Sequence, residues 1–143
     1  MTGVNLRFVQ ERAREIRENV QKVQRYAALP DDEFFSDERT LYTVMHLLLI
    51  AIEAVGALCN HLLAKTAHQA PGSYAECFDG LRDLGHLDDD LAGRLIRMAR
   101  FRNILVHRYW EIDSHQILRY ARENLGDFDA YLQAVGKIIG RDV

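Results

Sequence analysis

A long apolar stripe in the first half of the chain constrains the fold more than any other feature. Between Leu41 and Ala64 the sequence reads LYTVMHLLLIAIEAVGALCNHLLA, with large apolar residues at alternating spacings of four and three. The stripe consists of Leu41, Met45, Leu48, Ile52, Val55, Cys59 and Leu62. This spacing puts the side chains on one face of an α-helix, which near-parallel neighbouring helices must cover. We therefore expect a long central helix over about residues 37–65.

The same stretch is long enough to cross a bilayer, but its polar residues argue against that interpretation. His46, Glu53 and Asn60 recur every seven residues, and a carboxylate near the centre of a membrane span would be costly. We interpret the stretch as the core helix of a protein that does not enter a membrane. The N-terminal segment has no uninterrupted apolar run typical of a signal peptide, so the expected location is the cytoplasm.

Strand-like alternation is absent from the rest of the chain, which indicates an all-α fold in a single domain, residues 1–143. Four more helices are predicted, over about residues 4–28, 73–85, 88–107 and 113–139. Long helices joined by short loops favour antiparallel neighbours. The expected architecture is therefore an antiparallel up-down four-helix bundle with one short additional helix.

Cysteine and histidine spacings indicate no metal site and no cofactor. Cys59 and Cys77 are too few for a disulfide framework, and each lies in an apolar stretch. We expect both to be free and to pack in the core as small apolar side chains. Four histidines follow no zinc-binding spacing and are expected at the surface or at helix caps, namely His61, His68, His86 and His115.

The charge distribution carries more information than the net charge of −3. No acidic residue occurs between Leu91 and Trp110, while five arginines do: Arg94, Arg97, Arg100, Arg102 and Arg108. A local arginine strip on an otherwise acidic protein is typical of a phosphate-binding surface.

Arg102 has an unusual place in this strip. It stands between Met98 and Leu105 on the apolar face of its predicted helix, a face that also contains Leu91, Leu95 and Tyr109. A guanidinium on an apolar face must be paired, line a cleft or face a partner. Glu53 is the only charged residue in the central apolar stretch, so it is the expected partner of Arg102.

His107 adds a titratable group five residues after Arg102. A histidine can take the 2′-hydroxyl proton of RNA, a second can protonate the leaving 5′-oxygen, and an arginine can stabilise the charge on the phosphate oxygens. One chain offers one well-placed histidine. Ideal helix geometry puts Arg102 and His107 about 140° apart. They can converge if the helix end is distorted or if two motifs meet across a symmetric dimer.

The segment RNILVHRY, residues 102–109, matches the R-x4-H-x-Y motif of the HEPN superfamily and resembles the HepT-like toxins in particular. The similarity extends over SYAECFDGLRDLGHLDDDLAGRLIRMARFRNILVHRYWEID, the closing helix and AIEAVGALCNHLLAK. It therefore covers nearly the whole chain as one HepT-like domain.

The resemblance implies a toxin that is a homodimer and a metal-independent RNA endonuclease, with a composite site in the cleft between subunits. Arg102 and His107 would be catalytic, and Asn103 would be the polar residue that usually follows the arginine. Tyr109 stands where an MntA-type nucleotidyltransferase antitoxin attaches AMP groups.

Apart from the resemblance, the position of Glu53 on the central helix suggests either that it orients Arg102 as a supporting residue or that it belongs to a line of satisfied polar groups at a helix or subunit contact. From the charge distribution, three arginines of the strip are expected to contact RNA phosphates: Arg97, Arg100 and Arg108.

Two other interpretations stay open at this point. The chain could be a non-catalytic helical module that binds RNA, nucleotide or a partner protein through the arginine strip. It could also be a structural dimerisation domain in which Arg102 and Glu53 form a buried ion pair, with His107 facing the helix dipole.

Overall fold

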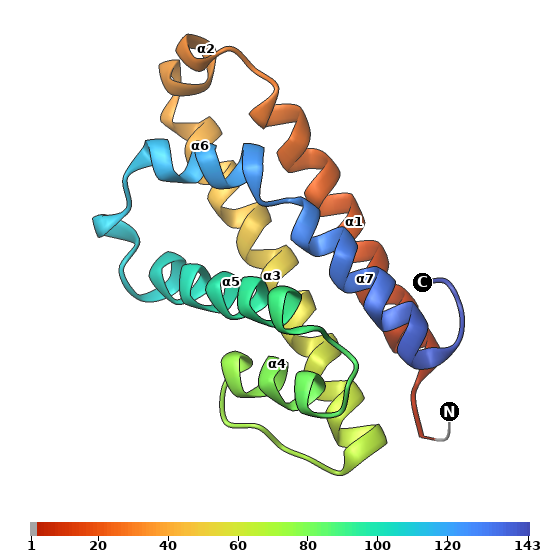
Figure 1. The fold of residues 1–143 in the computed structure, drawn as a ribbon. Coiled ribbons are helices and arrows are strands. Elements are labelled where there is room, and N and C mark those ends of the chain that lie inside the picture. The colour runs from red at the N-terminus through yellow and green to blue at the C-terminus, as the bar shows by residue number, and fades with distance from the viewer. Residues whose placement is uncertain (1–2) are drawn as a thin grey trace.

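The computed structural model describes residues 3–143, which contain seven α-helices and no β-strand (Figure 1). The α-helices are α1 (Leu6–Ala27), α2 (Asp31–Ser36), α3 (Glu38–Ala67), α4 (Tyr74–Asp83), α5 (Asp89–His107), α6 (Ser114–Glu123) and α7 (Gly126–Ile139), and a 3-10 turn, η1 (Tyr109–Glu111), follows α5. The all-α prediction is confirmed.

Helix α3 is the centre of the fold. It begins after Asp37, whose carboxylate accepts the backbone N–H of Arg39 at 2.9 Å, and it ends at His68 in the left-handed conformation (φ 53°). Its most apolar 18-residue window would suffice for a membrane span by length and composition, and 56% of that window is buried inside the protein. The burial confirms the interpretation of this stretch as a core helix.

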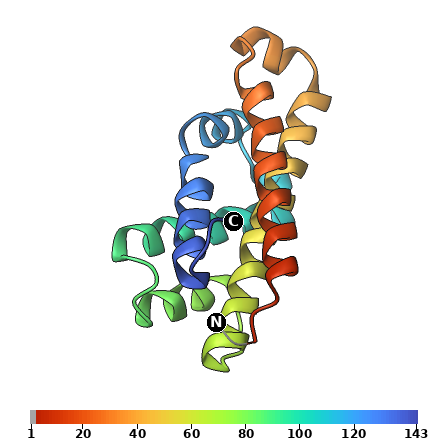
Figure 2. The same ribbon diagram turned by 90° about the vertical axis from the view of Figure 1, so that its right-hand side faces the viewer.

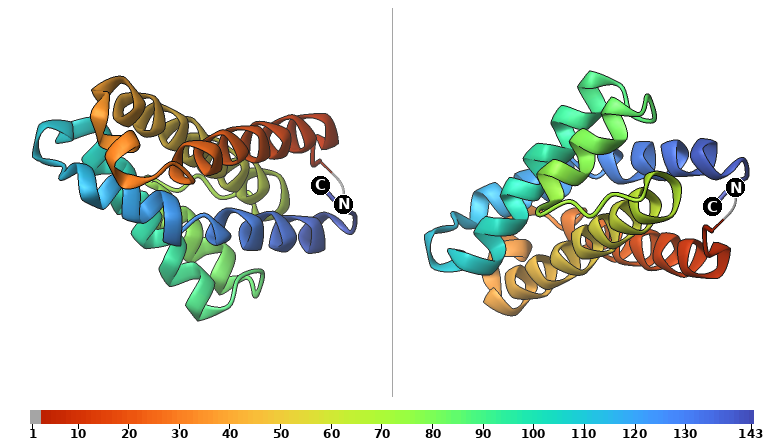
Figure 3. Two further views of the ribbon diagram at one scale, coloured as in Figure 1. Left: turned by 90° about the horizontal axis from the view of Figure 1, so that it is seen from above. Right: turned by 90° about the horizontal axis from the view of Figure 1, so that it is seen from below.

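The other long helices lie against α3 in different directions (Figures 1 and 2). Helix α1 runs antiparallel to α3, with Val9, Ala13 and Ile16 fully buried and its charged residues facing outward. Helix α5 instead crosses α3, and α4 with the start of α5 projects to one side of the α1–α3 pair (Figure 3). The crossing brings residues of α3, α4 and α5 together at one place.

The segment after α1 differs from the prediction, because Pro30 does not only break a helix. It precedes the short helix α2, whose first turn holds Asp31, Asp32 and Glu33. Acidic side chains stabilise a helix N-terminus, and the buried Phe34 anchors this one to the core.

The prediction of one helix over residues 113–139 is wrong. Helix α6 ends at Glu123, with Asn124 as its C-cap, and α7 starts anew at Gly126, because the turn lets each half pack separately. Arg122 holds α6 in place by donating to the carbonyl oxygens of Ala27 and Leu29 at 3.0 and 2.9 Å.

The cysteines require a second correction. Cys59 and Cys77 are both fully buried, as predicted, but their sulfur atoms form a disulfide bond between α3 and α4 instead of standing free. Sequence spacing could not show this pairing, because it depends on how α4 folds back along α3, where the two Cα atoms lie 6.1 Å apart.

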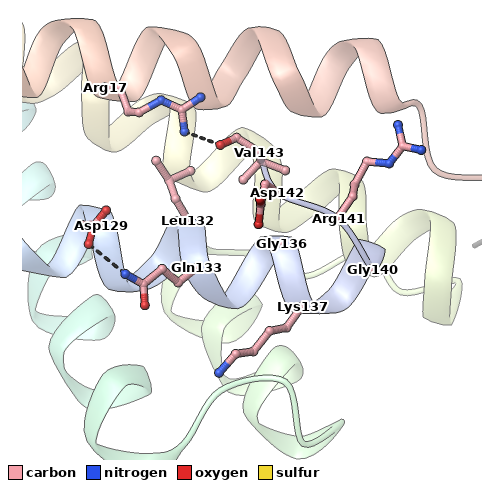
Figure 4. A pocket seen from close by; sticks show the side chains of 10 residues that line it. All are labelled: Arg17, Asp129, Leu132, Gln133, Gly136, Lys137, Gly140, Arg141, Asp142 and Val143. Atoms are coloured by element: carbon pink, nitrogen blue, oxygen red, sulfur yellow. Dashed lines mark hydrogen bonds between the residues drawn. The ribbon is translucent and has the colours of Figure 1, made fainter.

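The start of α1 and the end of α7 lie on the same side of the molecule (Figure 3). A cavity of about 560 Å³ lies there, between Arg17 of α1 and the end of α7 (Figure 4). Arg17 donates to the main-chain oxygen of Val143 at 2.6 Å, and Asp129 and Asp142 add negative charge to the lining. This mixed-charge cavity contains no residue of the 102–109 motif.

Candidate active site

Helix α5 presents the motif. Asp88 caps its N-terminus by accepting the N–H of Leu91 at 2.7 Å, and the helix continues without a break to His107. Leu91, Leu95, Met98 and Leu105 are buried as the stripe predicts, and Arg102 interrupts the stripe as expected. Its side chain is 24% exposed, so the guanidinium lies at the edge of the core with one side open to solvent.

Arg102 is held by an ion pair and two further contacts. Its Nε donates to Oε1 of Glu53 at 2.6 Å, and its Nη1 donates to Oδ1 of Asn103 at 3.1 Å. The guanidinium carbon also lies 5.3 Å from the centre of the Tyr74 ring. The structure therefore contains the contact between Arg102 and Glu53 that the sequence led us to expect.

The second oxygen of Glu53 is occupied by a residue that sequence analysis did not single out. Tyr74, the first residue of α4, donates its hydroxyl to Oε2 of Glu53 at 2.5 Å. Burial, and next the hydrogen bond to the Glu53 carboxylate, raises the pKa of Tyr74 to about 12. The phenol thus stays protonated at neutral pH and can act as a donor.

A glycine on α3 makes room for this tyrosine. A Cβ at position 56 would clash with the Tyr74 ring. Helices α3 and α4 can therefore approach this closely at Tyr74 only because residue 56 is a glycine. A glycine inside an otherwise apolar helix costs about 1 kcal/mol relative to alanine. That cost is the one sequence signal that could have pointed to a close approach here.

His107 and Tyr109 lie at the exposed end of α5. His107 is the last residue of the helix, and it makes no side-chain hydrogen bond within residues 3–143. The chain then leaves the helix at Arg108, so Tyr109 does not continue the buried stripe and is 59% exposed. Tyr109 therefore does not lie in the core.

Because α5 stays regular through His107, the motif does not converge within one chain. Arg102 and His107 are separated by five helical residues and point about 140° apart around the helix axis. The distorted helix end that could have joined them is not present.

The arginine strip divides into two groups. Arg94 pairs with Asp127 and Asp90, and Arg108 lies 3.7 Å from Glu111, so both have acidic neighbours. Arg97 and Arg100 are exposed and form no ion pair within the described part of the chain. The strip is thus less continuous than the sequence suggested.

A cavity of about 490 Å³ opens beside Arg102, between α5 and the loop that leads into α4. Its polar lining comes from Arg100, Arg102, Asn103, Asn60 and Ser73, with Tyr74 at its wall and no acidic side chain. Such a lining suits an anion. Within residues 3–143 no group of three or more His, Cys, Asp or Glu side chains is arranged to hold a metal ion.

Solved structures of similar fold include toxins in complex with antitoxins and a protein of unknown function. The tri-AMPylated HEPN toxin of Shewanella oneidensis, in complex with its MNT antitoxin, superposes with a TM-score of 0.84 at 21% identity, over 91% of this chain and 97% of that one. A toxin–antitoxin structure with AMP-PNP gives 0.81 at 21% identity, over 90% and 97%. The cytosolic protein YutE of Bacillus subtilis gives 0.78 at 18% identity, over 100% and 98%.

At these identities the superpositions establish the fold, and the sequence establishes the family. Comparison with curated proteins found no significant match. The family described as "Ribonuclease HepT-like" matches residues 16–135, which include α3, α4, α5 and the whole motif. The chain therefore belongs to the HepT-like ribonuclease family.

Proposed function

We propose that this protein is an endoribonuclease toxin in which Arg102 and His107 are the catalytic residues. The observation that carries the proposal is the anchoring of Arg102. A half-buried guanidinium is held by Glu53 and Asn103, while within residues 3–143 no hydrogen bond engages its Nη2, which stays available to a ligand. An oriented cation of this kind can stabilise negative charge that develops on a phosphate.

The proposed reaction is a metal-independent transesterification of RNA. The 2′-oxygen attacks phosphorus and the bond from phosphorus to the 5′-oxygen breaks, which leaves a 2′,3′-cyclic phosphate and a 5′-hydroxyl. One histidine accepts the 2′-hydroxyl proton and another donates a proton to the 5′-oxygen. Arg102 binds the non-bridging oxygens throughout.

The second histidine would come from a second copy of the chain. The regular helix points His107 away from Arg102 of the same chain, whereas a two-fold axis can place two motifs face to face. We therefore propose a homodimer with a composite site in the cleft between subunits. Arg97, Arg100 and Arg108 would guide the RNA backbone to this cleft.

Two residues support Arg102 in this proposal. Glu53 fixes the direction of the guanidinium through its 2.6 Å contact, and Asn103 adds a neutral acceptor at 3.1 Å. Glu53→Gln should lower cleavage while the protein stays folded. Unchanged cleavage in that variant would remove Glu53 from the catalytic machinery.

The proposed regulation is AMP transfer to Tyr109 by an MntA-type nucleotidyltransferase antitoxin in the cytoplasm. Two relatives of the same fold are a tri-AMPylated toxin with its MNT antitoxin and a toxin–antitoxin structure with AMP-PNP. Tyr109 of this chain is 59% exposed and lies two residues beyond His107, the last residue of α5. Negative phosphates at that position would repel RNA from the arginines.

Cleavage of labelled RNA by the purified, unmodified protein in EDTA tests the proposal, beside His107→Ala. We expect a 2′,3′-cyclic phosphate product from the wild type and none from the variant. RNA that stays intact with both, after mass spectrometry has excluded adducts on Tyr109, would overturn the ribonuclease. Salt-dependent binding without cleavage would instead identify an RNA-binding module.

A further inference from the structure

We infer that Tyr74, which lies outside the R-x4-H motif, is a positioning residue that orients Arg102 through Glu53. The expected effect of Tyr74 on kcat rests on the proposed ribonuclease function. The contacts from Tyr74 to Glu53 and Arg102 rest on geometry alone. Helix α4 thereby contributes a hydrogen-bond donor to the site, in addition to Glu53 from α3 and Arg102 from α5.

Helix α4 contacts α3 closely at three successive positions along the two helices. Tyr74 packs on Gly56, Cys77 is bonded to Cys59, and a Cβ at Gly80 would meet Leu63. On both helices these residues are spaced by three or four positions, so they form one continuous line of contact. The first position, Tyr74, is the one that faces Glu53 and Arg102.

Both oxygens of Glu53 are engaged because of this approach. Oε1 accepts from Nε of Arg102 at 2.6 Å, and Oε2 accepts from the hydroxyl of Tyr74 at 2.5 Å. A glutamate bound at one oxygen alone can still rotate its carboxylate, whereas one bound at both cannot without losing a bond. Tyrosine suits this role because its ring is rigid and loses little side-chain entropy.

The same tyrosine also touches the arginine directly. Its ring centre lies 5.3 Å from the guanidinium carbon, within the range of a cation–π contact. Tyr74 thus borders Arg102 on one side and holds its counter-ion on the other.

Tyr74→Phe is the informative variant, because it keeps the ring and the helix contact and removes only the donor. The hydrogen bond to a charged carboxylate is lost, which we expect to lower kcat about tenfold with KM within about twofold. In a Glu53→Gln background the same change should lower kcat less than about twofold, because the two residues act through one contact.

Tyr120→Phe is the matched control. It also removes one tyrosine hydroxyl, and that hydroxyl is buried without a hydrogen-bond partner in residues 3–143. Its ring stacks on Phe101 of α5 at 4.1 Å, so the control probes a tyrosine that packs on the same helix but makes no hydrogen bond to Glu53 or Arg102. We expect wild-type kcat and KM for this variant.

A spectroscopic readout separates this inference from the proposed function. In 15N NMR spectra the Arg102 Nε–H, identified by its loss in Arg102→Lys, should exchange slowly in the wild type and in Tyr120→Phe. It should exchange at least about tenfold faster in Tyr74→Phe, because the carboxylate that protects it is free to rotate.

The two readouts fail independently. If the wild type does not cleave RNA, the proposed function is wrong and the NMR comparison alone decides the role of Tyr74. If the wild type cleaves RNA but Tyr74→Phe keeps full kcat, the positioning role is overturned. It is also overturned if the losses of kcat from Tyr74→Phe and Glu53→Gln multiply when the two changes are combined. Unchanged Arg102 exchange in Tyr74→Phe overturns it in either case.

Discussion

The two halves of the R-x4-H-x-Y motif lie in very different surroundings. Arg102 is embedded where α3, α4 and α5 meet, with Glu53, Asn103 and Tyr74 around it. His107 and Tyr109 lie at the end of the same helix, exposed and, within residues 3–143, without side-chain hydrogen bonds. The exposed end also carries Trp110, which is 67% exposed and contacts Tyr109 at 5.3 Å between ring centres.

The difference indicates that the two ends of the motif have different roles in the proposed site. The proposed electrostatic part of the site, Arg102, is held at the edge of the chain's own core, where a preorganised cation would need no rearrangement during the reaction. The residues that we propose to transfer a proton and to carry AMP, His107 and Tyr109, are open to other molecules, which agrees with our proposal of a second subunit and an antitoxin. Changes at the two ends should therefore have different consequences for stability.

The largest expected effect comes from removing either of the two residues that we propose to be catalytic. His107→Ala and Arg102→Ala should each reduce RNA cleavage about 1000-fold or more. Only Arg102→Ala should also lower the free energy of unfolding, by about 1 kcal/mol, because Glu53 loses its partner at a partly exposed site. Denaturant unfolding measures the difference. Equal losses of unfolding free energy in both variants would contradict the contrast between an anchored Arg102 and an exposed His107.

The disulfide on the Arg102 side gives the next largest effect. The bond between Cys59 and Cys77 spans a sequence separation of 18 residues, so reducing it should lower the free energy of unfolding by about 3 kcal/mol. Unfolding in denaturant with and without reductant tests this. A Cys59→Ala/Cys77→Ala variant should not respond to reductant, and a wild type equally insensitive would show that the thiols are free in solution.

Gly56→Ala should disturb the anchored end through packing. The added methyl group meets the Tyr74 ring, and overpacking of this kind costs about 2 kcal/mol. Displacement of Tyr74 should lower kcat as well. Gly93→Ala is the control, because a Cβ there meets only the tip of Arg97 at 3.8 Å; it should be neutral or slightly stabilising. Thermal unfolding and kcat of the two variants can be compared directly.

The smallest effect is expected at the exposed end. Tyr109→Phe removes one exposed hydroxyl, so the free energy of unfolding should change by less than about 0.5 kcal/mol and cleavage by less than about twofold. The variant should nevertheless resist inactivation by an MntA-type nucleotidyltransferase with ATP, followed by mass spectrometry. AMP transfer that proceeds equally well in the variant would place the modification on another residue.

Local patterns predicted much of the fold, because helix periodicity and capping depend on neighbours within about four residues. The stripe from Leu41 to Leu62 indicated α3, and Asp88 correctly marked the start of α5. The same logic missed the break at Asn124, since each half of the predicted helix is amphipathic and nothing local forbids one long helix. The break follows from what α6 and α7 each pack against.

The sequence by itself determined that the chain is helical, that α3 lies in the core, and that Arg102 interrupts an apolar face and needs a partner. Glu53 could be named because it is the only charge in that apolar stretch. The tertiary structure alone decided that Cys59 meets Cys77 and that Tyr74 completes the contacts of Glu53. Those pairings depend on the direction in which α4 returns along α3, and side chains from different helices meet only once that direction is set by packing.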